Sequence, residues 1–110
     1  MAVANMGQLP DVRASSPIDA DIERRIHMAL FMDTHAIDGG VKAGDVAQAH
    51  LADLQTQDRY GVRYLRYWVD EGAGKIFCLV DAPDAEAAIR VHREAHGLVA
   101  QSISPVIEGE

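Results

Sequence analysis

Two histidines near the end of the chain, His92 and His96, lie four residues apart in the segment VHREAHG. On a helix this spacing makes the side chains neighbours, and two neutral imidazoles so placed can chelate one metal ion. The alternative is a pair of core histidines held by hydrogen bonds. A buried polar group without a partner costs about 1–3 kcal/mol, so both interpretations require partners for these rings.

Both histidines fall on the apolar side of the helix expected around them. With about 100° of rotation per residue, they share one arc with apolar residues. The charged residues of the segment point the other way, and these are Glu86, Arg90, Arg93 and Glu94. Two histidines in the middle of the apolar side of one helix favour a metal site over a pair of ordinary core histidines.

Further candidate ligands come from the first half of the chain. His50 shares an apolar arc with Val46, Ala47, Leu51 and Leu54 on an expected helix, and Asp53 lies at the edge of that arc. His35 ends an expected strand on the same side as Asp33, because strand side chains alternate. The predicted metal ligands are therefore His35, His50, His92, His96, Asp33 and Asp53.

The types of the candidate ligands limit the choice of metal but do not identify it. Imidazole with carboxylate suits nickel, copper, zinc or iron, and the scarcity of sulfur argues against a thiolate-rich site. The pattern is not the HExxH zinc motif, because Arg93 stands where that motif has glutamate. Cys78 lies in an apolar strand, and we interpret it as structural. Gly39-Gly40 lacks the lysine and hydroxyl residue of a phosphate loop.

Composition excludes several classes of protein. The chain has 110 residues, 48% of them hydrophobic, with 10 basic and 17 acidic residues and a net charge of −7. An acidic surface disfavours nucleic acid as a partner. The longest apolar run, Ile76 to Val80, is far shorter than the roughly 20 residues of a membrane span. With one cysteine and no secretory signal pattern, we expect a cytoplasmic protein without an internal disulfide.

The pattern of residues predicts the order β-α-β-β-α-β. Strands are expected at 28–36, 62–70, 75–82 and 101–107, and helices at 43–60 and 84–96. Asp84 is the expected N-cap of the second helix and Gly97 its stop. This order is that of the ferredoxin-like α+β fold, a four-stranded antiparallel sheet with two helices on one face. It occupies residues 28–107, between an N-terminal extension (1–27, with a short helix at 18–26) and a tail (108–110).

Two of the expected strands are apolar on both sides. MALFM and IFCLV are nearly continuous apolar runs, which is typical of strands buried on both faces. Two helices cover only one face, so we expect a second copy of the sheet on the other, in a homodimeric α+β barrel. The alternative is a monomer whose N-terminal segment crosses the sheet. In RYLRYW, simple alternation puts Arg63, Leu65 and Tyr67 on one face and Tyr64, Arg66 and Trp68 on the other.

The segments RYW, FCLVDAPD, HREAHG and AHLADL resemble those of a family of small bacterial nickel-binding proteins, formerly a domain of unknown function. The resemblance spans about Leu30 to Ile103. It implies a ferredoxin-like fold, a homodimer joined through its sheets, nickel as the bound ion and no established reaction. By the same resemblance His50, His92 and His96 are metal-related positions, and so is His35. Lys42 and Gly44 depart from the family, which has a threonine cap and an acidic residue there.

Three functions follow as hypotheses. The first is a non-catalytic protein that binds nickel or another divalent transition metal, for storage, buffering or response. The second is a dimeric α+β barrel enzyme of the monooxygenase or haem type, with the histidine-lined space between helices and sheet as its pocket. The third is an interaction module whose histidines are ordinary core residues.

Overall fold

The computed structural model describes residues 28–110 and confirms the predicted order of elements. The expected extension (1–27), with its short helix, lies outside the described residues. The elements, in chain order, are β2 (Ala29–Ala36), α2 (Ala43–Thr56), a 3-10 turn η1 (Gln57–Tyr60), β3 (Arg63–Asp70), β4 (Lys75–Ala82), α3 (Ala85–Ala95) and β5 (Ser102–Pro105). The last strand is shorter than the expected 101–107.

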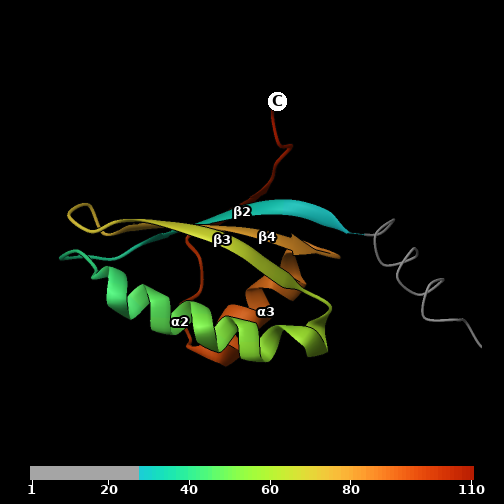
Figure 1. Ribbon diagram of the computed structural model, residues 1–110, viewed down its shortest axis with the longest axis horizontal. Coiled ribbons are helices and arrows are strands. Elements are labelled where there is room, and N and C mark those ends of the chain that lie inside the picture. The colour runs from blue at the N-terminus through green and yellow to red at the C-terminus, as the bar shows by residue number, and fades with distance from the viewer. Residues whose placement is uncertain (1–27) are drawn as a thin grey trace, which may run out of the picture.

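The four strands form one antiparallel sheet in the order β3-β4-β2-β5. Both helices lie against the same face, below the sheet in Figure 1. This is the ferredoxin-like arrangement, so the predicted fold is confirmed. Pro105 ends β5, an edge strand, where its missing N–H removes no central ladder bond. Within the described part of the chain, neither helix has the length and apolarity to cross a bilayer.

The first helix begins without a side-chain cap of its own. Lys42 occupies the N-cap position and makes no capping hydrogen bond. The carboxylate of Glu71, in the β3–β4 turn, instead accepts from the N–H of Ala43 at 2.7 Å. Glu71, 28 positions from Ala43 in the chain, thus compensates for the cap that Lys42 does not provide.

The second helix has the ends that its sequence predicts. The side chain of Asp84 accepts from the N–H of Ala87 at 2.8 Å. At the other end His96 is the C-cap, and Gly97 adopts a left-handed φ of 81° while its N–H donates to the carbonyl of His92 at 2.9 Å. These contacts fix where His92 and His96 stand relative to the sheet.

The β3–β4 hairpin packs against the end of β2 through a glycine. The N–H of Ile37 donates to the carbonyl of Gly74 at 2.7 Å, and Gly74 has a φ of +68°. A Cβ atom at Gly74 would overlap the carbonyl oxygen of Ile37. Glycine is therefore required here on two grounds, backbone conformation and space.

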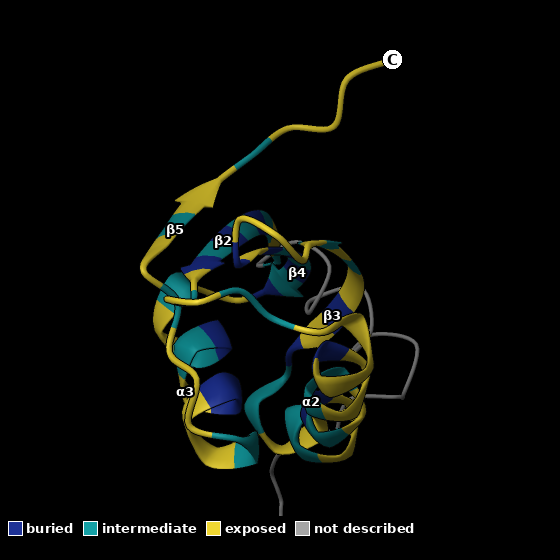
Figure 2. Cartoon of the chain, turned by 90° about the vertical axis from the view of Figure 1, so that its left-hand side faces the viewer, coloured by how far each residue is buried: buried dark blue, intermediate teal, exposed yellow. Residues whose placement is uncertain are grey.

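The core lies between the helices and the sheet, as the dark-blue segments of Figure 2 show. The opposite face of the two central strands carries half-buried apolar side chains, namely Leu30, Met32, Phe77 and Leu79. On the neighbouring strand Trp68 is 47% exposed. Among residues 28–110, neither helix covers this face.

A β-bulge changes which faces the residues of β3 occupy. The register with β4 shifts between Tyr64 and Arg66, so Tyr64 and Tyr67 both point to the helix side. The predicted alternation, which placed these two tyrosines on opposite faces, is wrong. An extra residue in one strand of a pair reverses the side-chain order beyond it, and the RYLRYW pattern carries no signal for it.

Candidate metal centre

Strand β2 supplies two of the polar groups below the sheet. Its residues alternate, so Phe31, Asp33 and His35 face the helices and are all buried. Asp33 is only 1% exposed and pairs in register with Cys78 of β4. The predicted placement of Asp33 and His35 on one side of the strand is confirmed.

Helix α3 supplies the ring at the centre of the site. His92 is 2% exposed, and each of its ring nitrogens meets a carboxylate. Nδ1 lies 2.9 Å from Oδ1 of Asp53, and Nε2 lies 3.0 Å from Oδ2 of Asp33. One ring therefore connects helix α2 with the sheet.

The charges of this group hold a proton on His92. Burial by itself lowers the pKa of His92, but hydrogen bonds to Asp33 and Asp53 outweigh it and raise that pKa to about 11. Burial raises the pKa of both carboxyls, and their contacts with histidines more than reverse this, so both pKa values lie below the ordinary value. These pKa shifts favour an imidazolium at His92 between the carboxylates of Asp33 and Asp53.

Asp53 is buried more deeply than the pattern of α2 predicts. It is 2% exposed, whereas Leu51 and Leu54 are 50% and 40% exposed. The prediction of an apolar arc containing those leucines, with Asp53 at its edge, is therefore wrong. Helix α2 is turned so that Asp53 reaches the histidines of α3, because hydrogen bonds to two rings satisfy the buried carboxylate.

Three atoms converge at the point where α2 and α3 meet. Nε2 of His96 lies 3.0 Å from Oδ1 of Asp53 and 3.1 Å from Nδ1 of His92. With the 2.9 Å between Asp53 and His92, these atoms form a nearly equilateral triangle. Ligands held at right angles about 2.1 Å from a metal are about 3 Å apart. The triangle therefore fits one face of an octahedral coordination sphere.

The tautomer of His96 in the metal-free protein follows from its other nitrogen. The N–H of Leu98 donates to Nδ1 of His96 at 3.0 Å. A neutral His96 ring therefore carries its proton on Nε2, which donates to Asp53. Both rings then donate to the same carboxylate oxygen, and this explains why their nitrogens approach each other.

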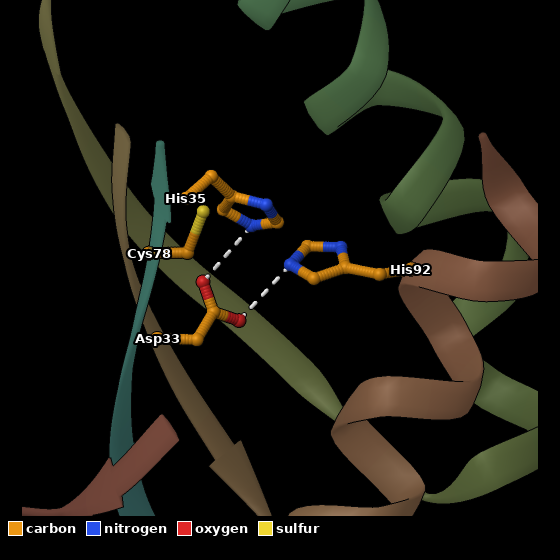
Figure 3. Close-up of side chains that lie close together, drawn as sticks. All are labelled: Asp33, His35, Cys78 and His92. Atoms are coloured by element: carbon orange, nitrogen blue, oxygen red, sulfur yellow. Dashed lines mark hydrogen bonds and ion pairs between the residues drawn. The ribbon is translucent and has the colours of Figure 1, made fainter. Parts of the chain in front are cut away.

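A second group of donors lies on the sheet side of His92. Asp33, His35, Cys78 and His92 each offer one ligand atom, and these atoms all lie within 4.8 Å of one another. Figure 3 shows the three side chains of the sheet pointing toward the ring of His92. Sequence reasoning missed Cys78. Its strand alternates Ile76, Cys78 and Val80 toward the helices, and that alternation was the available signal.

His50 is placed differently from the other histidines. It belongs to neither group of close donors, and its ring lies 4.7 Å from that of Tyr67. The rings of His35 and His96, in contrast, are each 4.9 Å from that of His92. Burial lowers the pKa of His50 and so favours its neutral form. The structure thus brings His35, rather than His50, next to His92.

A cavity connects the centre with the surface. Its empty volume is about 440 Å³, which includes its open mouth, and its wall contains His35, His50, Cys78, His92 and His96. The rest of the wall is mostly apolar and comes from α2, β3, β4 and the loop residues Val41 and Leu98. This cavity gives a small ion access to both groups of donors.

One family model and one solved structure are similar to this chain. A family model described as "Nickel responsive protein SCO4226-like" matches residues 31–106. The crystal structure of SCO4226 from Streptomyces coelicolor A3(2) superimposes with a TM-score of 0.69 at 38% identity, covering 74% of this chain and all of that one. No protein with a curated description matches the chain.

Proposed function

The chain belongs to the SCO4226-like family, and we propose that it binds nickel, or a similar divalent transition metal, without catalysing a reaction. Its role would be metal storage, buffering or response in the cytoplasm. The family description supports nickel as the ion. The observation that carries the proposal is the triangle of about 3 Å formed by Asp53, His92 and His96.

The three atoms of this triangle are the proposed ligands. Asp53 binds through Oδ1, His92 through Nδ1 and His96 through Nε2. The Nε2–H of His92 then continues to donate to Asp33, an arrangement in which a carboxylate orients a ligating histidine and raises its basicity. The hydroxyl of Tyr64, 3.2 Å from the same oxygen of Asp33, supports that carboxylate in turn.

Charge also favours a divalent ion. The carboxylates of Asp33 and Asp53 and the imidazolium of His92 together carry a net charge of −1 in a buried space. A divalent ion that replaces the Nδ1 proton of His92 brings this sum to zero. Buried charge is costly unless it is compensated, so the exchange improves the electrostatics of the centre.

Calorimetry on the full-length chain without an affinity tag tests the proposal. The parent protein is expected to bind nickel, and the double variant His92→Ala/His96→Ala is expected to lose that binding. Arg93→Ala, an exposed change on the same helix, is the matched control and should bind like the parent. If the double variant titrates like the parent and remains folded, the assignment of these ligands is refuted.

We also propose that two chains pair through the open faces of their sheets. The half-buried side chains of β2 and β4 opposite the helices, with the exposed Trp68, would form the contact. Such a pairing supplies the second layer that continuous apolar strands require. Light scattering should give twice the mass of the chain, and Phe77→Glu should reduce it to that of one chain. A single-chain mass for the parent protein contradicts the dimer.

An enzyme of the α+β barrel class is the second candidate, and the cavity beside the triangle is the observation that favours it. Two histidines and one carboxylate on a single octahedral face leave coordination positions open, as in non-haem iron oxygenases. A Soret band after addition of haem, or turnover of a quinol, would support this candidate over metal buffering.

A further inference from the structure

We propose that Asp33, His35 and Cys78 form a second metal position that shares His92 with the first, takes a zinc-type tetrahedral cation, and cannot be filled while the first is occupied. The inference goes beyond the nickel site and adds a sulfur ligand to the chemistry of the protein. It depends on the Asp53–His92–His96 site only for the statement that the two positions exclude each other.

The donors of this set have the types and placement of a closed zinc site. One thiol, two imidazoles and one carboxylate offer the sulfur, nitrogen and oxygen ligands that zinc binds tetrahedrally. All four residues are buried, and their ligand atoms lie within 4.8 Å of one another. The antiparallel register fixes this set, because Asp33 stands opposite Cys78 on the neighbouring strand.

An oxygen of Asp33 independently points to a missing ligand. Its Oδ1 is buried and, among the described residues, accepts no hydrogen bond. Nε2 of His35 lies 3.2 Å away, at ion-pair distance but without hydrogen-bond geometry. A buried oxygen that accepts no hydrogen bond is unfavourable. A cation between Asp33, His35 and Cys78 would satisfy it, and Figure 3 shows this oxygen on the side facing His35 and the sulfur.

The two positions exclude each other because of the chemistry of one ring. A neutral imidazole has a lone pair on only one of its two nitrogens. His92 turns Nδ1 toward Asp53 and Nε2 toward Asp33. A metal on one nitrogen therefore leaves a proton on the other, where it donates to the opposite carboxylate. The ring accepts nickel on the helix side or a zinc-type ion on the sheet side.

Cobalt(II) tests the sulfur ligand directly, because a thiolate bound to it gives a charge-transfer band in the near ultraviolet. The full-length protein without bound metal is titrated with cobalt. Binding at this position transfers the thiol proton of Cys78 and the Nε2 proton of His92 to the buffer. We expect intense tetrahedral absorption together with the thiolate band. His96→Ala should keep this spectrum, whereas Cys78→Ser should lose the thiolate band. A His96→Ala protein that remains folded and binds cobalt without that band overturns the proposal.

Competition between metals tests the exclusion. With zinc and nickel both in excess, elemental analysis after gel filtration should give a total of about one ion per chain. Two ions per chain, one of each metal, would refute the shared ring. Loss of nickel binding in His96→Ala with the cobalt thiolate band intact supports both sites. A nickel titration unaffected by His96→Ala refutes only the proposed function, so the two failures are distinguishable.

Discussion

Nickel binding at pH 7.5 is expected to release about one proton per ion, and that proton comes from His92. The ring is held as an imidazolium by Asp33 and Asp53, with a pKa of about 11. Nickel takes the Nδ1 position, so its binding must displace the proton there. The proton of His96 only moves from Nε2 to Nδ1 and adds nothing to the count.

The free energy that proton displacement costs follows from the difference between the pKa of His92 and the pH. Displacing a proton of pKa 11 at pH 7.5 costs about 5 kcal/mol of binding free energy, at 1.36 kcal/mol per unit. The apparent affinity for nickel should therefore rise about tenfold for each pH unit between about 7 and 9. The direction is upward because the group competing with the metal is protonated below its folded pKa and free above it.

Calorimetry in two non-coordinating buffers with different ionisation enthalpies measures the number of protons. If one proton is released per ion, the binding enthalpies measured in the two buffers should differ by the difference between the ionisation enthalpies of those buffers. As a control, calcium chloride at equal ionic strength should release no proton, because imidazole is a poor ligand for calcium. An affinity for nickel that does not change between pH 7 and 9, or binding without proton release, would refute the account of an imidazolium between two carboxylates.

Three further outcomes are expected. Gly74→Ala should lower the free energy of unfolding by about 3 kcal/mol, because alanine there would need a left-handed backbone and its Cβ would overlap a carbonyl oxygen. Urea denaturation measures this loss, and the control is Gly72→Ala, where a Cβ meets nothing within 4 Å. Equal denaturation midpoints for the two variants would contradict the reasoning. Glu71→Ala should cost about 1 kcal/mol in the same assay, as expected for loss of a helix cap, and no change would show that the cap is dispensable. The amide of Leu98 donates to Nδ1 of His96. When nickel binds Nε2, the proton of His96 lies on Nδ1 and this hydrogen bond is lost, so the Leu98 amide should exchange faster with solvent. An unchanged hydrogen-exchange rate would mean that His96 is not a ligand.

The elements of this fold could be predicted because their signals are local. The alternation of Phe31, Asp33 and His35, the capping residue Asp84 and the stop at Gly97 each act over a few positions. A period of two residues or of 3.6 residues indicates which residues share one side of a strand or a helix. Such periods were enough to give the element order and the convergence of His92 with His96.

The errors arose where one element depends on another. No period in AHLADL shows that Asp53 is buried and Leu51 and Leu54 are exposed, because hydrogen bonds to α3 decide the rotation of α2. The bulge that turns Tyr67 to the helix side depends on the pairing of β3 with β4.

The sequence by itself determined the order of the elements, the shared side of Phe31, Asp33 and His35 on β2, and the presence of several inward histidines. Only the tertiary structure decided which donors share a site. It placed Cys78 opposite Asp33, brought His35 to His92 in preference to His50, and turned Asp53 into the centre. The physical reason is that secondary structure depends on neighbouring residues, whereas a ligand set depends on strand register and helix rotation. Those are set by contacts between residues far apart in the chain, such as Asp33 and His92, which are 59 positions apart.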